Sequence, residues 1–359
     1  MYRICYLADG KSIHTRRWCE YFLSQGFEIH LITFRATEIP GVIVHFVDCG
    51  NIEVSGNNKK VLLKIPQIRR ILYKIKPDIV HAHYATSYGI TGALSGFHPF
   101  VVTALGSDVL ISPFQNKLYK FILRFVFRKA DWITAMSDPM KEIMISLGAA
   151  KNKTETVIFG IDPDIFNDRN RNTPANTFTI ISTRNFEDVY NINVLIRALN
   201  LVNQKIKNIK VHLIGAGSKE TQIKSLIGEL HLTSIVEMHG RMPQQQIADL
   251  LRASHLFVSV SSSDGNNISL NEAMACGCLS VVSDIPANRQ WITDGKNGFF
   301  TGAITAEAIA AKILQAHASY NDLIVEANVI NQKVINEKAI WKTNMQKVEQ
   351  QYLKLCRHE

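Results

Sequence analysis

The chain has 359 residues, 46% of them hydrophobic and 20% charged, which excludes a disordered protein and suits two domains of ordinary size. No apolar run reaches the roughly 18 residues of a membrane-spanning helix. The N-terminus also lacks the charged-then-apolar layout of a secretion signal, so we expect a cytoplasmic protein. The formal net charge is +9. The six cysteines form no pair at zinc-ligand spacing, which predicts structural cysteines and no metal site.

Short apolar runs alternate with helical patterns in the first half of the chain. The runs lie at 2–9, 28–34, 78–83, 100–105 and 131–137. The helical patterns lie near 15–25, 60–76, 85–96, 114–129 and 138–148. Near-continuous apolar strands separated by helices are typical of a parallel sheet that is buried on both faces.

Basic residues are concentrated in this half. Twelve Lys or Arg residues lie between Lys59 and Lys129, against two acidic residues, and two helical patterns there mix them with Leu, Ile and Phe. Such helices can lie on an anionic membrane surface. They can equally be core-packing helices with a solvated basic face. We expect no nucleic acid, because no aromatic and basic recognition module is present.

The segment 156–178 is rich in Gly, Pro, Asn and Asp, which is typical of a linker. After it the alternation restarts and continues to a helical tail from about 304. The sequence therefore predicts two Rossmann-like domains, 1–168 and 169–335, that face a cleft, and a last helix, 336–359, that crosses back to the first. Ligands of such sheets bind at the carboxyl ends of the strands.

The most informative stretch is 259–286, which indicates a strand, a polar loop, a short helix closed by Gly277 and a second strand. Its loop residues precede a helix N-terminus, where free backbone N–H groups and the helix dipole favour a phosphate. Asp264 and Glu272 stand eight residues apart across this turn. A diphosphate with a sugar on one side and a nucleoside on the other would fit this layout.

A second glycine turn, Gly215-x-Gly217, follows a strand. A dinucleotide-binding fingerprint would require glycine at 220, where this chain has Glu220. We therefore interpret the glycines as a tight turn near the predicted site.

The stretch 259–300 resembles the retaining, nucleotide-sugar-dependent glycosyltransferases of family 4, which have the GT-B fold. Their E-x7-E pattern corresponds to Asp264-x7-Glu272, followed by AMACG at 273–277 and DGKNGF at 294–299. Segments 101–108, 130–138 and 157–166 are also similar to that family, so the resemblance extends over most of the chain.

The resemblance implies a donor site in the second domain. Glu272 would bind the ribose hydroxyls of the nucleotide, and Asp264 the hydroxyls of the donor sugar. Backbone N–H groups would come from Gly265, Asn266, Asn267, Ile268 and Ser269. The plainer alternatives are a dipole-complementing acid in the first turn of the helix for Glu272, and an Asx turn or N-cap for Asp264.

Arg184 falls where the family places an arginine that neutralises the donor diphosphate. An always-charged, bidentate donor suits that role. The lysine that usually follows is absent, and Tyr190 and Asn191 occupy that region. Arg241 is the candidate replacement, and Gly215 is also expected to contribute to donor binding.

In the first domain the family histidine is replaced by Leu105. His83, at a strand end, and His14 are the alternative catalytic candidates, each with a structural role as the plainer interpretation. Gly10 and Asp108 are candidates for the acceptor side, and Asp108 could equally cap the segment that follows it.

We therefore expect a retaining glycosyltransferase that uses a UDP- or GDP-linked sugar, without a metal or other cofactor. The expected acceptor is a lipid-linked or growing cell-surface polysaccharide, such as O-antigen, capsule or exopolysaccharide, with peripheral contact to the cytoplasmic membrane face. Two alternatives remain open: a non-catalytic GT-B subunit of a transferase complex, and a GT-B sugar-nucleotide epimerase. No hydrolase or kinase motif occurs.

Overall fold

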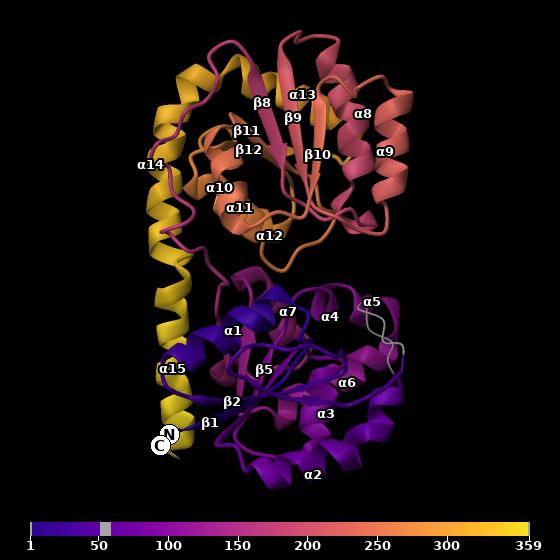
Figure 1. Cartoon of the computed structure of the whole chain (residues 1–359), viewed down its shortest axis with the longest axis vertical. Helices are drawn as coiled ribbons and strands as arrows, with labels where there is room; N and C mark the ends of the chain where they lie inside the picture. Colours follow the sequence, from indigo (N-terminus) through magenta and orange to yellow (C-terminus); the bar gives the residue numbers. More distant parts are fainter. Residues whose placement is uncertain (1, 51–58, 358–359) are drawn as a thin grey trace. The chain divides into compact units, whose positions relative to one another are not determined.

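The computed structural model describes residues 2–50 and 59–357, which fold into two compact α/β units (Figure 1). Unit 1 comprises Met1–Ile158 with Thr343–Glu359, and unit 2 comprises Phe159–Lys342. In the described residues each unit has one parallel sheet with helices packed against it.

The sheet of unit 1 has the strand order β3-β2-β1-β4-β5-β6-β7 in the described part of the chain. Its strands are β1 Arg3–Leu7, β2 Glu28–Thr33, β3 Ile43–Phe46, β4 Ile79–His83, β5 Phe100–Thr103, β6 Trp132–Ala135 and β7 Thr154–Thr156. The five apolar runs of the sequence correspond to β1, β2, β4, β5 and β6. The two edge strands were not predicted from apolar runs, because β3 has no buried residue and β7 has only three residues.

The helices of unit 1 connect these strands. They are α1 Ile13–Ser24, η1 Lys59–Lys64, α2 Ile65–Ile75, α3 Tyr88–Ser95, α4 Ser107–Leu110, α5 Ser112–Gln115, α6 Lys117–Lys129, α7 Asp138–Ser146, η2 Lys151–Lys153 and α15 Trp341–Cys356. The two basic helices, α2 and α6, both pack against α3. They therefore belong to the same side of unit 1.

Unit 2 has the strand order β10-β9-β8-β11-β12-β13 within the residues described. Its strands are β8 Phe178–Ser182, β9 Ile209–Ile214, β10 Val236–Gly240, β11 Leu256–Ser259, β12 Leu279–Ser283 and β13 Phe299–Thr301. Its helices are η3 Asp188–Tyr190, α8 Ile192–Asn203, α9 Glu220–Glu229, α10 Gln244–Arg252, α11 Ile268–Ala275, α12 Pro286–Arg289, α13 Ala306–Ala318 and α14 Tyr320–Lys338. Figure 1 shows α8 and α9 lying together beside the sheet, where they help to enclose its apolar core.

The chain passes from unit 1 to unit 2 after Ile158, earlier than the sequence analysis placed the boundary. The backbone N–H of Ile161 donates to the carbonyl of Ala339 at 2.7 Å. A Cβ at Gly160 would lie only 2.2 Å from the same carbonyl oxygen, so the two backbones are in close contact. These contacts join the segment after Phe159 to the end of α14, which a composition shift alone does not reveal.

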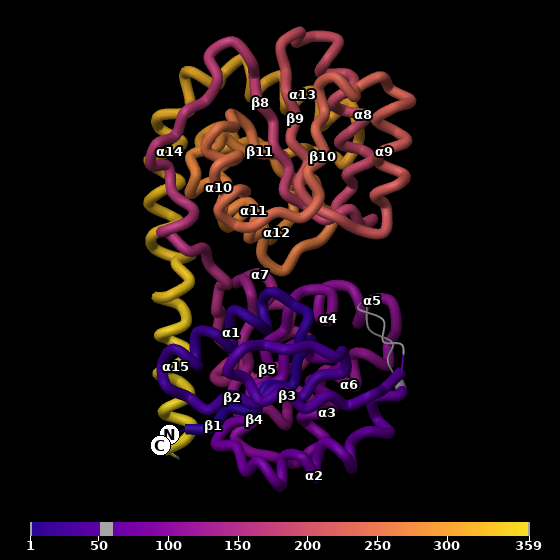
Figure 2. Tube along the Cα trace, viewed as in Figure 1, coloured from indigo at the N-terminus to yellow at the C-terminus, as the bar shows by residue number. Residues whose placement is uncertain are grey.

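The C-terminal helix α15 packs on unit 1, beside α1 (Figure 2). The rings of Phe22 and Tyr352 stack with centroids 4.9 Å apart. The hydroxyl of Tyr352 also hydrogen-bonds Nδ1 of His81, whose Nε2 lies 2.7 Å from Oγ1 of Thr103. A buried polar chain therefore links α15 to the middle of the sheet.

Candidate functional site

The carboxyl edge of the unit 2 sheet brings together most of the predicted donor-site residues. Arg184 follows β8, Gly215 follows β9, and Gly240 ends β10. The loop after β11 carries Asp264. Because parallel strands end at the same edge of a sheet, residues that are far apart in the sequence meet here.

Arg184 is buried, with 7% of its surface exposed, and its guanidinium has three partners. Nη2 donates to Oδ2 of Asp264 at 2.5 Å, and Nη1 donates to Oδ1 of Asn267 at 2.9 Å. The guanidinium also lies 4.3 Å from the ring centroid of Tyr190, a cation–π contact. Nε is buried and has no hydrogen-bond partner among the described residues.

Asp264 is oriented by this ion pair. Both side chains are largely buried, at 8% exposure for Arg184 and 14% for Asp264, so solvent screens the pair less than at a surface. The second carboxylate oxygen, Oδ1, accepts no hydrogen bond from the described part of the chain. Asp264 is not the helix N-cap, which is Asn267, so the N-cap interpretation of Asp264 is wrong.

Asn267 connects the site to the interior of unit 2. It is fully buried, and its Oδ1 accepts from the backbone N–H of Leu270 at 3.1 Å as well as from Arg184. Its Nδ2 donates to Asn288 Oδ1 at 3.0 Å and to Ser259 Oγ at 3.2 Å. The amide therefore caps α11 and fixes the position of Arg184 at the same time.

Backbone N–H groups at the start of α11 differ in whether they already have a hydrogen-bond acceptor. Those of Gly265, Asn266, Asn267 and Ser269 have no acceptor within the described residues. The N–H of Ile268 donates to the carbonyl of Asn266 at 2.9 Å, so it is already used. The side chain of Asn266 is also occupied, because its Oδ1 accepts from Trp291 Nε1 at 3.0 Å.

Glu272 lies on α11, beyond its first turn, which holds no acidic residue. The alternative interpretation of Glu272 as a first-turn acid is therefore wrong. The side chain is partly exposed, and its backbone carbonyl accepts from the N–H of Cys276. A carboxylate at this place can accept two hydroxyl hydrogen bonds from a ligand.

Gly215 packs directly on the backbone of Arg184. Its φ of +149° and the 2.5 Å distance from a built Cβ to the Arg184 carbonyl oxygen both require glycine. Its N–H donates to the carbonyl of Gly240 at 2.9 Å, which aligns the ends of β9 and β10. Arg241 follows and is exposed, without an ion pair or hydrogen bond to the residues described.

In unit 1 the two candidate histidines lie close enough to interact electrostatically. His83 is 1% exposed, and neither ring nitrogen has a hydrogen-bond partner in the described chain. Burial, reinforced by His14, lowers the pKa of His83 to about 3. Burial, reinforced by Arg17, lowers the pKa of His14 to about 4. Both imidazoles are therefore neutral at pH 7.

Asp108 and Gly10 hold loops at the carboxyl edge of the unit 1 sheet. The buried carboxylate of Asp108 accepts from the N–H groups of Ala85 at 2.6 Å, Gly106 at 2.9 Å and Leu105 at 3.2 Å. Asp108 therefore fixes the loops that precede it. It does not cap the following segment, because it lies inside α4, whose N-cap is Gly106 without a side-chain hydrogen bond. Gly10 follows β1, where a Cβ would lie 2.2 Å from Thr37 Cγ2.

Two family models match the chain. Residues 3–137 match "Glycosyl transferase 4-like", and residues 164–328 match "Glycosyl transferases group 1". The chain belongs to the group 1 glycosyltransferases.

The glycosyltransferase is 25% identical over 308 residues to the N-acetyl-alpha-D-glucosaminyl L-malate synthase of Bacillus anthracis, covering 81% of this chain and 80% of that protein. It is 24% identical over 275 residues to the putative colanic acid biosynthesis glycosyltransferase WcaL of Escherichia coli K12, covering 73% of this chain and 67% of that one. Anabaena Alr3699/HepE, solved in complex with UDP and glucose, superposes with a TM-score of 0.79 at 17% identity over 99% of this chain and 100% of its own. The predicted GT-B fold class is confirmed.

Two features of the glycosyltransferase site were missed in the sequence. Tyr190 was recognised only as the residue near a missing lysine, although its ring lies against the guanidinium of Arg184. Asn267 was expected to act through its backbone, whereas its side chain makes four hydrogen bonds. The sequence signal for Asn267 was its place before the helix, where Asn is a preferred N-cap.

Proposed function

We propose that this group 1 glycosyltransferase transfers a sugar, with retention of anomeric configuration, from a UDP- or GDP-linked donor to an acceptor hydroxyl. Unit 2 binds the donor, with the diphosphate at Arg184 and the α11 N-terminus, the sugar at Asp264 and the ribose at Glu272. The relatives that are named for colanic acid biosynthesis and the UDP complexes of a structural neighbour support this class of substrate.

The observation that carries the proposal is the buried, unpaired Nε of Arg184. A buried polar group without a partner costs free energy, so it calls for a ligand that satisfies it. The free N–H groups of Gly265, Asn266, Asn267 and Ser269 add a second set of donors on the loop that carries Asp264. An anion bound there would accept from a guanidinium and from a helix N-terminus together.

The chemistry follows from where charge develops. As the bond between sugar and diphosphate breaks, negative charge builds on the departing phosphate, and a fixed cation at Arg184 lowers the barrier. A departing phosphate oxygen takes the proton of the incoming hydroxyl on the same face, so no protein base is required. We assign no metal to this step and expect turnover to persist in excess EDTA; a strict requirement for Mg²⁺ or Mn²⁺ would overturn that assignment.

Arg184→Lys tests the donor site, because lysine keeps the charge but loses the forked geometry. We expect kcat/KM to fall about 100-fold, by analogy with removal of one transition-state donor. We also expect UDP and GDP sugars to lose most of the thermal stabilisation that they give the wild type. Arg197→Ala, an exposed arginine of α8, is the matched control. Unchanged donor binding and turnover in Arg184→Lys would refute the assignment.

For the acceptor we propose a lipid-linked saccharide at an anionic membrane surface. Large apolar side chains are exposed on the basic helices η1, α2 and α6 and on the adjoining α5: Leu63, Tyr73, Phe114, Leu118 and Phe121. Exposed apolar groups beside cations suit the boundary between headgroups and acyl chains. None of the helices in the described part of the chain has the length and apolarity needed to cross a membrane.

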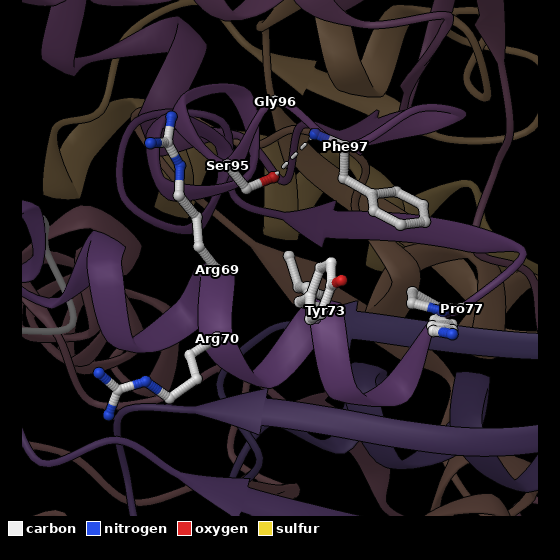
Figure 3. Close-up of a pocket in the computed structure, with 9 residues that line it drawn as sticks. Arg69, Arg70, Tyr73, Pro77, Ser95, Gly96 and Phe97 are labelled. Atoms are coloured by element: carbon white, nitrogen blue, oxygen red, sulfur yellow. Dashed lines mark hydrogen bonds between the residues drawn. The ribbon is translucent and has the colours of Figure 1, made fainter.

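An open hollow of ≈ 820 Å³ lies on this side of unit 1 (Figure 3). It is lined by Arg69, Arg70, Leu72, Tyr73, Lys76, Pro77, Ser95, Gly96 and Phe97. The guanidinium of Arg69 is held by two hydrogen bonds to the carbonyl of Leu94, at 3.1 and 2.6 Å. A hollow with cations and one exposed aromatic ring suits an anionic headgroup.

Vesicle flotation tests the membrane proposal. The variant Tyr73→Glu/Phe121→Glu is expected to lose binding to vesicles with anionic lipid at low salt, whereas the wild type floats. Val325→Glu/Val329→Glu, which changes two exposed apolar residues of α14 in the same way, is the matched control. Equal flotation of all three proteins, or none for the wild type, would contradict the proposal.

A further inference from the structure

Three potential metal ligands lie on one face of the edge of the unit 2 sheet. His212 on β9 stands opposite Glu237 on β10 in the strand register, and His239 follows two residues later. The strand register is irregular between Met238 and Gly240, so regular alternation does not place His239. Its side chain faces His212 all the same, because its Nε2 lies 2.9 Å from His212 Nδ1. The neighbours Val211, Leu213 and Val236 belong to the apolar core on the other face.

The ligand atoms converge. His212 Nδ1 lies 2.9 Å from His239 Nε2 and 3.6 Å from Glu237 Oε2. One ligand atom from each of the three side chains lies within 4.8 Å of the other two. A tetrahedral ion with bonds of about 2.0–2.1 Å separates its ligand atoms by about 3.3 Å, which the observed distances bracket.

We propose that His212, Glu237 and His239 bind one divalent ion of the Zn²⁺ class, with a fourth position left to water. Each imidazole would bind through the nitrogen that faces the other and keep its proton on the opposite nitrogen. Glu237 is half exposed, at 50%, and provides an entry path, whereas His212 and His239 are 8% and 16% exposed. Two imidazoles and one carboxylate form a donor set that suits zinc.

A competing cation occupies one side of the cluster. Lys210 Nζ lies 3.0 Å from Glu237 Oε2, and both side chains are about half exposed. Exposed ion pairs of this kind are weak, so the carboxylate can exchange its partner. Removal of the lysine charge should therefore strengthen binding of the ion.

Unit 1 contains a similar histidine pair that provides an internal control. His30 Nδ1 lies 3.0 Å from His45 Nε2. The neighbouring carboxylate, Glu28, contacts the other nitrogen of His30 at 2.7 Å and is also bound by Arg3. The carboxylate therefore lies away from the nitrogens that face each other, and the three ligands do not converge.

The proposed ion lies beside the donor site without belonging to it. His239 precedes Gly240, whose carbonyl accepts from Gly215, and Gly215 packs on Arg184. An ion at this cluster would fasten the edge strand next to that turn. The proposal is independent of donor binding, because its ligands are separate from Arg184 and Asp264.

Zinc titration of the full, tag-free, chelator-treated chain tests the proposal. The wild type is expected to bind one Zn²⁺ per chain and to show the visible band of four- or five-coordinate Co²⁺ with the cobalt probe. Glu237→Gln and His239→Ala should each weaken the zinc affinity at least about tenfold. Lys210→Ala should tighten it several-fold, and His45→Ala should match the wild type.

Circular dichroism and unfolding curves would show that each variant is folded. Glu237→Gln is a surface change that keeps the proposal testable even if His239→Ala unfolds. Equal zinc affinity in the wild type, Glu237→Gln and Lys210→Ala, or no binding by the wild type, would overturn the proposal.

Discussion

The guanidinium of Arg184 meets a carboxylate, an amide and an aromatic ring, and each contact restricts it differently. Asp264 and Asn267 fix the two terminal nitrogens, while Tyr190 covers the plane. A side chain held in this way loses little further entropy when a diphosphate binds. Preorganisation of this kind suits a cation that stabilises the negative charge which develops on a departing phosphate.

Asp264→Asn separates donor binding from transfer. The change removes the negative charge that balances Arg184, so more of the cation's field is available to a diphosphate, and we expect UDP to bind as tightly or more tightly. The change also removes the strongest acceptor for a sugar hydroxyl, so kcat should fall about 100-fold.

Calorimetry with UDP and turnover measurements check this prediction together. Asp249→Asn, which alters an exposed ion pair with Arg252 on α10, is the control and should change neither quantity. A parallel loss of UDP affinity and kcat in Asp264→Asn would mean that Asp264 acts only by positioning Arg184.

At the scale of elements, the short helix α11 depends on its N-cap. Asn267→Ala removes the cap and leaves buried partners without hydrogen bonds, which we expect to cost about 3 kcal/mol of unfolding free energy. Thr305→Ala removes an exposed N-cap of α13 and should cost about 1 kcal/mol. Urea unfolding curves measure both. A similar small loss in the two variants would show that the Asn267 network contributes little.

Helices, strands and turns were predictable where the residues that determine them are neighbours in the sequence. Apolar runs of six to eight residues in the first half of the chain predicted buried strands of four to six residues, and Gly215 and Gly277 marked turns that require φ above zero. The edge strand β3 has no buried face to produce such a run. The cluster of His212, Glu237 and His239 depends on strand register, which residue spacing along the chain does not reveal, and from that spacing we expected no metal site.

At the scale of the whole molecule, buried histidines make stability depend on pH. Burial lowers the pKa of His83 to about 3, that of His14 to about 4, and that of His81 far below its usual value. In the unfolded chain these groups titrate near 6.5. As the pH falls below 6.5, the unfolded state binds more protons than the native state, so stability decreases with falling pH.

Between its unfolded and native pKa values, we expect each such histidine to lower the free energy of unfolding by about 1.4 kcal/mol for every unit that the pH falls. Urea unfolding at pH 7.5, 6.5, 5.5 and 4.5 measures the slope. His83→Leu removes one titrating group that has no hydrogen bond to lose in the described chain, so its slope should be shallower. Stability that is independent of pH across this range would contradict the prediction. Hydrogen bonds from Arg3 and His30 lower the pKa of Glu28 to about 2. Glu28 therefore loses its contribution to stability only as the pH falls below its unfolded pKa of 4.5.

The return of residues 343–359 to unit 1 has a consequence for biosynthesis. Unit 2 is one continuous segment and can fold once Lys342 has left the ribosome. Unit 1 must wait, with Phe22 and His81 lacking their partner Tyr352, until α15 has been made. A released chain that is truncated within α15 would thus carry a complete unit 2 and an uncovered aromatic surface on unit 1, a state that favours aggregation and chaperone binding. The half of the enzyme that is translated first is the half that matures last.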